Sequence, residues 1–328
     1  MIDTIKLWLS AEDLIDTDIM AELPLKLSNT STLVNDETNK VKVTGDLGSL
    51  SVLLSESGVS IKGSLSKYYK GNNMHTLTFK EIEDAFVKIG SALGIPIEKA
   101  KVRRLDITEN YVVDYPVSNY FPYMGGMTYY DRLQMNNGIY YNGNKRTVLF
   151  YDKVHERKLK KEPVLDCYLN KNVFRYELRF MNRLGGQFSK PALLVSDLLD
   201  KAFFRGLLII YINQYQGIYK HKSVLHYSKL KISNRAEFWQ QIKLLGVESV
   251  GGEAMLLQTI RQGNKDKAFK NKMVAHRIMN DIRNIYQAST LSTSNSLIDE
   301  LDIKIETKIK EYVKLNLSSQ PEELCAAP

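Results

Sequence analysis

Cysteine is scarce in this chain of 328 residues, which contains only Cys167 and Cys325. Two cysteines are too few for a disulfide framework and are typical of a protein in a reducing compartment such as the bacterial cytoplasm. Long apolar runs are also absent, because the longest, at residues 207–212, is far shorter than the ~20 residues that a membrane-spanning helix needs. No basic leader segment precedes the first strand-like residues. We therefore expect a cytoplasmic protein with no membrane partner.

Acidic residues are in the minority. The chain has 45 lysines and arginines against 37 aspartates and glutamates, which gives a net charge of +8 and favours an anionic partner. The basic residues are dense between positions 145 and 161, with tyrosines nearby, and only Asp152 and Glu156 oppose them. This pattern suits a DNA backbone whose bases stack on aromatic rings, or equally a solvated loop or helix face. The basic cluster consists of Lys145, Arg146, Lys153, Arg157, Lys158, Lys160 and Lys161.

The hydrophobic pattern predicts an α+β protein in three parts. Residues 1–190 are expected to form an antiparallel sheet packed on helices, which we interpret as a catalytic domain. Residues 191–290 are expected to be helical, and residues 291–328 to form a linker and a tail helix. Strands are expected over 47–54, 59–63, 101–113 and 173–181, and helices over 196–215, 235–245, 253–262, 266–287 and 297–316. The stretch 114–137 is expected to be irregular, and the stretch 153–172 is expected to be a basic connector.

Two short motifs sharpen this prediction. Thr78-Phe79-Lys80-Glu81 is a capping box, because the threonine oxygen can accept from the Glu81 amide while Glu81 reaches back, and it predicts a helix that ends near Gly94. Asn142-Gly143-Asn144 lies between two strand-like runs, and Asn-Gly is a strong signal for a tight hairpin turn.

Three strand-like segments each carry one chemically distinctive side chain. Asp106 lies in the first, Tyr151 ends the second with Lys153 just beyond it, and Glu177 lies in the third. Side chains alternate between the faces of a strand, so a sheet packed on helices by its apolar face would present Asp106, Glu177 and Tyr151 on its open face. The same face is expected to carry Arg104, Thr108, Arg175 and Arg179.

These residue types suit metal-assisted attack of a tyrosine on a phosphodiester. Asp106 and Glu177 supply the oxygen ligands that Mg²⁺ or Mn²⁺ prefers, and a bound cation would polarise the phosphate. Lys153 would favour the phenolate form of Tyr151, and neighbouring arginines would stabilise the charge that develops on phosphorus. The alternative is structural: acidic residues on a sheet commonly form cross-strand ion pairs, and a strand tyrosine commonly only packs.

Residues 101–181 resemble the gene II/gene X replication proteins of filamentous phages and the Rep-trans plasmid initiators. The shared pattern is Arg104-Leu105-Asp106, then residues 146–153 ending in Tyr151-Asp152-Lys153, then Arg175-Tyr176-Glu177-Leu178-Arg179. The start Met1-Ile2-Asp3 and the segment Lys62-Gly63-Ser64-Leu65-Ser66-Lys67, followed by Gly71-Asn72-Asn73, also resemble the phage proteins. The likeness covers most of residues 1–190.

The resemblance implies a rolling-circle replication initiator. Such a protein nicks one strand at a double-strand origin, forms a 5′-phosphotyrosyl bond and leaves a 3′-OH for a host polymerase, before strand transfer and religation. Tyr151 would be the nucleophile, Lys153 an activating or phosphate-contacting group, and Asp106 and Glu177 the metal ligands. Origin duplex, single-stranded DNA and the host helicase and polymerase are the implied partners.

The chain also departs from related nucleases. Many carry a His-hydrophobe-His metal motif, but none of the histidines at positions 75, 155, 221, 226 and 276 stand in that spacing. His75 and His155 stay open as a ligand or proton carrier. Asn72 occupies a place where some phage relatives have histidine.

Further DNA contacts are expected from Lys62 and Lys67, and from Arg104, Arg146, Arg175 and Arg179. The basic helices within 235–287 could bind origin duplex or support dimerisation into a homodimer. Tyr140, Tyr141 and Tyr168 are alternative or second nucleophiles. A relaxase or transposase, and a non-catalytic replication regulator that binds DNA, are the rival functions.

Overall fold

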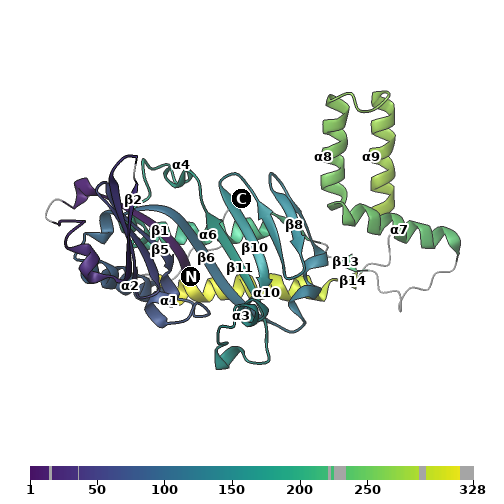
Figure 1. The fold of residues 1–328 in the computed structure, drawn as a ribbon. Coiled ribbons are helices and arrows are strands. Elements are labelled where there is room, and N and C mark those ends of the chain that lie inside the picture. Colours follow the sequence, from purple (N-terminus) through teal and green to yellow (C-terminus); the bar gives the residue numbers. More distant parts are fainter. Residues whose placement is uncertain (15–16, 36, 221–222, 225–233, 288–292, 318–328) are drawn as a thin grey trace.

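The computed structural model describes residues 1–14, 17–35, 37–220, 223–224, 234–287 and 293–317. Its centre is a ten-stranded antiparallel sheet with the order β2-β3-β4-β5-β1-β6-β11-β10-β9-β8 (Figure 1). The longest strand, β6, lies at the middle of the sheet, between β1 and β11. The strands are β1 Ile2–Ser10, β2 Ser28–Asn35, β3 Lys40–Leu47, β4 Leu50–Ser55, β5 Gly58–Ser64, β6 Lys101–Val113, β8 Asp131–Met135, β9 Gly138–Asn142, β10 Arg146–Asp152 and β11 Asn172–Phe180.

Local sequence signals explain several of these elements. The capping box forms as expected, with the Thr78 oxygen accepting from the Glu81 amide, and it starts α2 (Phe79–Leu93), which ends at Gly94 in the left-handed conformation. The Asn-Gly turn joins β9 to β10, so the predicted hairpin is confirmed. The strand expected over 101–113 is β6, with the same bounds.

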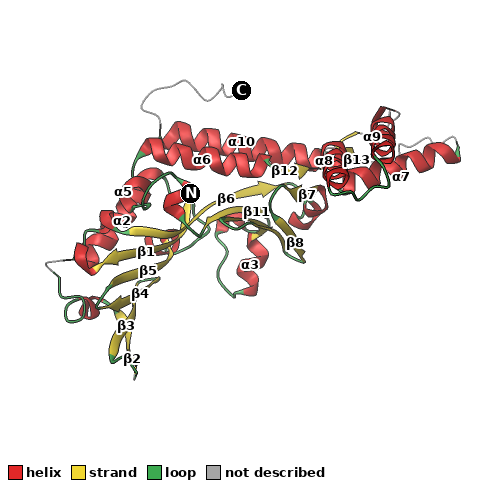
Figure 2. Cartoon of the chain, turned by 90° about the horizontal axis from the view of Figure 1, so that it is seen from above, coloured by secondary structure: helices red, strands yellow, loops and turns green. Residues whose placement is uncertain are grey.

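Helices cover one face of the sheet and leave the other largely open. Figure 2 shows α6 (Lys201–Gln216) and α10 (Ser296–Asn316) side by side along the sheet, with α3 (Lys153–Leu159) on the opposite side. Tyr176 of β11 stacks on Tyr211 of α6 with ring centroids 4.0 Å apart, and each hydroxyl donates to the other residue's carbonyl. The expected antiparallel α+β fold is confirmed, and its apolar face is the one that meets the helices.

The structure corrects two local expectations and adds a helix to the basic connector. The segment 114–137 was expected to be irregular, yet it supplies β8 to the sheet and β7 (Met124–Met127), which pairs with β12 (Ile218–Lys220). The connector 153–172 begins with α3, because the Asp152 carboxylate caps the His155 amide at 2.9 Å. The helix expected over 196–215 is two helices, α5 (Val195–Leu198) and α6, since Asp200 caps the latter.

The last helix belongs to the main core rather than to a separate tail. Ile298, Leu301, Ile305 and Ile309 of α10 are buried in the same hydrophobic cluster as the sheet and α6. By contrast, α7 (Arg235–Ser249), α8 (Gly252–Lys265) and α9 (Lys272–Gln287) bury a smaller cluster of their own and stand beside the sheet in Figure 1. The remaining described α-helices and strands are α1 (Leu65–Lys70), α4 (Leu184–Gln187) and the pair β13 (Ser223–Val224) with β14 (Thr293–Ser294).

Across the described ranges, no helix is both long enough and apolar enough to cross a membrane. The first residues of the expected linker and tail (291–292), and the chain beyond residue 317, lie outside the described residues.

Candidate active site

Three neighbouring strands bring the predicted acidic residues and the tyrosine to the open face. β11 lies between β6 and β10, and its register places Arg179 opposite Asp106, and Arg175 opposite Tyr151. Glu177 lies between these two arginines along β11, on the same face. The apolar residues that alternate with them, such as Tyr176 and Leu178, point into the core. Alternation along each strand therefore gathers Asp106, Glu177 and Tyr151, as expected from the sequence.

The two carboxylates are close, and arginines neutralise them. Nε of Arg179 donates to Oε1 of Glu177 at 2.5 Å and lies 3.8 Å from Oδ2 of Asp106. Arg104 forms a two-pronged pair with Asp106, with Nε–Oδ1 at 2.9 Å and a terminal nitrogen 2.6 Å from Oδ2. Both carboxylates are almost fully buried.

Their electrostatic environments differ. Burial raises the pKa of Asp106 to about 7; Arg104 opposes this rise, and the nearby negative charge of Glu177 adds to it. Burial also works to raise the pKa of Glu177, but Arg179 and Arg175 outweigh it and hold that pKa below its usual range. The pair thus consists of one carboxylate and one group poised to release a proton.

Tyr151 touches this pair. Its hydroxyl donates to Oε2 of Glu177 at 3.1 Å, and the residue is half-buried at the edge of a cavity. Burial raises the pKa of Tyr151 well above its usual value, although the positive charge of Arg175 acts against this. The side chain is therefore a neutral phenol whose proton already faces a carboxylate.

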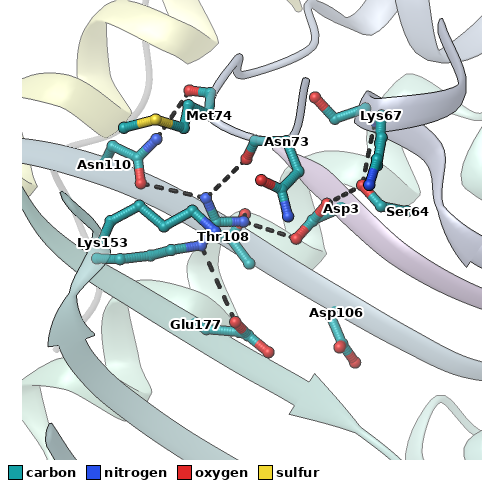
Figure 3. Close-up of polar contacts among 12 residues, drawn as sticks. Asp3, Ser64, Lys67, Asn73, Met74, Asp106, Thr108, Asn110, Lys153 and Glu177 are labelled. Atoms are coloured by element: carbon teal, nitrogen blue, oxygen red, sulfur yellow. Dashed lines mark hydrogen bonds and ion pairs between the residues drawn. The ribbon is translucent and has the colours of Figure 1, made fainter. Parts of the chain in front are cut away.

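Arg175 is buried and is hydrogen-bonded to four other residues of the protein. The expectation that it contacts DNA is therefore corrected. Its two terminal nitrogens donate to the Asn73 carbonyl (2.9 Å), Asn110 (3.2 Å), Asp3 (2.6 Å) and Thr108 (3.0 Å). These partners converge in Figure 3, beside Glu177, whose carboxylate lies 4.0 Å from Nε of Arg175. The guanidinium thereby ties β1, β6 and the loop after α1 to the strand that carries Glu177.

Sequence reasoning did not assign roles to the partners of Arg175. Two of them, Asp3 and Asn73, lie in stretches that already resembled the phage proteins, so that resemblance was the available signal. Asp3 is further held by Ser64, whose hydroxyl donates to it at 2.5 Å and also accepts the Lys67 amide at the start of α1. The start of α1 is in this way fixed against the site.

Lys153 lies beside the site but not at the end of a strand. It is the first residue of α3, is almost fully buried, and donates to Glu156 at 2.8 Å. Burial and the positive charge of Arg175 lower the pKa of Lys153 to about 8, against the effect of Glu156. Its ammonium lies 5.9 Å from the ring centre of Tyr151.

The other predicted DNA-contacting residues fall into two groups. Lys62 and Arg104 lie on the open face in one cross-strand row, with Lys6 of β1 between them. Lys67 pairs with Glu162 at 3.0 Å. Arg146, however, lies on the same side of its strand as the core residues Val148 and Phe150, stacks on the ring of Phe180, and donates to Gln187 at 2.8 Å. It is not brought to the carboxylates.

The alternative residues are also placed. Tyr141 points into the core and donates to the Gly125 carbonyl, whereas Tyr140 lies on the open face and lines the same cavity as Tyr151. Tyr168 is half-buried. His155 is exposed at the cavity, and His75 is exposed after α1. Among the described residues, no group of three or more His, Cys, Asp or Glu side chains is arranged to hold a metal ion.

Two carboxylates are nevertheless a donor set that suits one kind of ion. Mg²⁺ commonly binds through one or two carboxylates and completes its shell with water and substrate phosphate. Burial disfavours the charged form of Asp106 and raises its pKa, and a divalent cation would favour that charged form. Asp106 and Glu177 therefore fit Mg²⁺ or Mn²⁺ as oxygen ligands.

A basic α+β protein whose open sheet face gathers a tyrosine, two carboxylates and arginines has the chemistry of a protein that acts on phosphodiesters. Comparison with protein families agrees with this class. The family model for the N-terminal region of the gene II replication-associated protein matches residues 1–201. The chain belongs to this family of filamentous-phage proteins, as the sequence resemblance indicated, and is a phage replication initiator whose partner is DNA. A search of curated proteins found no match.

Proposed function

We propose that this initiator nicks one DNA strand at its replication origin and that Tyr151 is the nucleophile. The observation that carries the proposal is the hydrogen bond of 3.1 Å from the Tyr151 hydroxyl to Glu177, inside a group of arginines on an open sheet face. A structural tyrosine needs no such setting, whereas a nucleophile needs an acceptor for its proton and compensation for charge on phosphorus.

These contacts support the following covalent step. The Tyr151 oxygen forms a bond to phosphorus, its proton passes to Glu177, and the bond from phosphorus to the 3′ oxygen breaks. The leaving oxygen takes up a proton from water and becomes the 3′-OH that a host polymerase extends, Glu177 returns its proton to water, and the 5′ phosphate stays on the tyrosine. Attack by a later 3′-OH on the phosphotyrosine reverses these changes and religates the strand.

The surrounding cations would act on the phosphate. Arg179 and Arg104 are partly exposed, so each can turn from its carboxylate toward a phosphate oxygen. Lys153 is too tightly enclosed for that role and would act by electrostatic support of the phenolate. A divalent cation held by Asp106 and Glu177 would supply positive charge to both the phenolate and the phosphate.

A covalent-adduct assay tests the nucleophile. The full chain is mixed with Mn²⁺ or Mg²⁺ and with end-labelled single-stranded DNA that carries the replicon's own candidate origin. We expect a denaturation-resistant labelled band for the wild type, and none for Tyr151→Phe or in EDTA. Tyr140→Phe is the matched control, because it removes a hydroxyl from the adjacent strand on the same face.

Each other result assigns a different function. An adduct that persists in Tyr151→Phe moves the nucleophile to another tyrosine, with Tyr140 next in position. Tight origin binding without any adduct would support the non-catalytic regulator and contradict the proposal. An independent test of the cation uses thermal unfolding: Mn²⁺ should raise the unfolding temperature of the wild type more than that of Asp106→Asn.

The wider reaction is proposed on the same basis. Strand transfer, a host helicase and polymerase as partners, and action in the host cytoplasm follow from a rolling-circle scheme. A homodimer is proposed as one role of the basic helices within 235–287. A relaxase or transposase would share the chemistry of Tyr151 and would differ in the DNA that it joins.

A further inference from the structure

A cavity of about 690 Å³ opens beside Tyr151 on the open face of the sheet. We infer that it receives one unpaired base of the DNA strand, next to the phosphate that Tyr151 attacks. This inference rests on the proposed function, since Tyr151 and Arg179 form one side of the cavity. The size agrees with a nucleotide, because sites for ligands of this scale commonly enclose about 300–1,000 Å³.

The walls of the cavity suit a flat aromatic ring. Leu149, in register with Glu177, is fully buried, and Tyr140 lies opposite it on β9. Met135 and Leu159 also line the cavity, and both are exposed large apolar side chains, at 53% and 65%. Large apolar side chains gathered around one hollow indicate that a ligand covers them. An extruded base would be held here by stacking between aromatic and apolar side chains.

Polar groups at the rim suit the rest of a nucleotide. The amides of Asn136 and Asn137, in the β8–β9 turn, can donate to and accept from the edge of a base. Lys160 and Arg179 are the basic residues of the lining; each is paired with a carboxylate and can turn from it toward a flanking phosphate. The acidic residues of the lining are already engaged: Asp152 caps α3, and Glu156 binds both Lys153 and Lys160.

The occupant must be unpaired. A base inside a duplex has its faces covered by its neighbours, so it cannot present a ring face to Tyr140 or Leu149. A base taken out of the stack would fix the strand relative to Tyr151 and thereby choose which phosphate is attacked. The cavity would then determine the position of the nick, whereas the basic row at Lys62, Lys6 and Arg104 would bind the backbone without regard to sequence.

Abasic scanning of DNA, combined with a cavity variant, tests this inference. The probes are single-stranded oligonucleotides that span the replicon's candidate origin, each with one base replaced by an abasic tetrahydrofuran. Binding is measured by fluorescence anisotropy in a Tyr151→Phe background, so that no cleavage occurs. Tyr140→Ala is compared with Tyr115→Ala, which removes a half-exposed tyrosine outside the cavity lining.

We expect one probe position at which loss of the base weakens binding by roughly 5- to 100-fold, the value of one stacked base. Tyr140→Ala should weaken binding to the intact strand to a similar degree and add little at that position, because both changes remove the same contact. Leu159→Glu, at the exposed rim, is a second cavity variant that leaves the core untouched and should act in the same direction.

Additive effects at every position, or no sensitive position, would overturn the inference. Because DNA binding is measured with a variant that lacks the Tyr151 hydroxyl, the base-site inference and the proposal of Tyr151 as nucleophile can fail separately. An adduct at Tyr151 without coupling at Tyr140 would contradict the cavity inference alone. Coupling at Tyr140 without any adduct would retain the base site and remove the nucleophile.

Discussion

At the residue scale, the site depends on an asymmetry between two buried carboxylates. The sequence predicted that Asp106 and Glu177 share a face, but it did not predict that they would differ. Glu177 is held ionised by Arg179 and Arg175 and receives the Tyr151 hydroxyl, whereas burial and Glu177 itself raise the pKa of Asp106 to about 7. A proton acceptor and a readily neutralised partner thus lie side by side.

The raised pKa of Asp106 predicts a pH-dependent stability. The Asp106 carboxyl has a pKa of about 4 in the unfolded chain and of about 7 in the folded protein. The folded state binds more protons within that window, so the contribution of Asp106 to stability is present below it and is lost as pH rises through 7. Asp106→Asn should therefore gain stability relative to wild type between pH 4 and 7, by at most about 4 kcal/mol.

Denaturant unfolding of both proteins at a series of pH values measures this difference. Glu177→Gln is the informative comparison, because the lowered pKa of Glu177 predicts the opposite sign: its contribution is present above its ordinary pKa and is lost as pH falls. Curves for Asp106→Asn and wild type that run parallel from pH 4 to 8 would contradict the unequal pair.

At the element scale, one glycine of β9 allows that strand to lie close to Tyr151 on β10. Gly138 pairs with Tyr151, and a Cβ atom added to it would lie 2.6 Å from the Phe150 carbonyl and 3.1 Å from Cβ of Tyr151. Both contacts are too close to be tolerated without movement of the strand. The position of Tyr151 and the shape of the adjoining cavity therefore depend on the missing side chain.

Gly138→Ala should consequently lower the stability by about 1–3 kcal/mol, as overpacking does, and slow adduct formation more than it weakens DNA binding. Gly206→Ala is its control. Nothing lies within 4 Å of a Cβ at this position inside α6, so alanine there should stabilise the protein by about 0.5–1 kcal/mol. Denaturant unfolding midpoints of the two variants measure this difference. Equal changes in stability for Gly138→Ala and Gly206→Ala would refute the steric argument.

At the scale of the whole molecule, helices beyond the family match complete the core. The matched region ends at residue 201, yet α10 buries Leu301 and Ile305 against the sheet cluster. The hydroxyl of Tyr312 donates to the Leu77 carbonyl at 3.0 Å, and Asn316 accepts the Phe79 amide at the start of α2. The sheet that carries the site and the last described helix are therefore expected to unfold together.

Ile305→Ala should cost about 2–4 kcal/mol, because it leaves a cavity in this core. Ile303→Ala, on the exposed side of the same helix, should change stability by less than about 0.5 kcal/mol. Tryptophan fluorescence in a Trp239→Phe background makes Trp8 of β1 the reporter. A normal Trp8 transition in Ile305→Ala, with loss of helical signal alone, would show that α10 is an independent tail.

Short-range patterns in the sequence were sufficient for much of the fold. The capping box at Thr78, the Asn-Gly hairpin and the alternation along β6 and β11 act within a few residues, and each produced the expected element. Alternation also placed Asp106, Glu177 and Tyr151 on one face. The stretch that became α3 was missed because a dense run of lysines and arginines is ambiguous until Asp152 is seen to cap it.

What only the tertiary structure decided concerns contacts between distant segments. The burial of Arg175 among Asp3, Asn73 and Asn110 does not follow from local pattern, since it depends on which strands and loops lie alongside. The side on which Arg146 lies does follow from alternation with Val148 and Phe150, but its contacts with Phe180 and Gln187 depend on the fold. The attachment of α10 to the core and the cavity beside Tyr151 have the same origin. The sequence by itself determined which residues could perform the chemistry, and packing between strands and helices far apart in the chain decided which of them meet, because burial and register exist only in the folded protein.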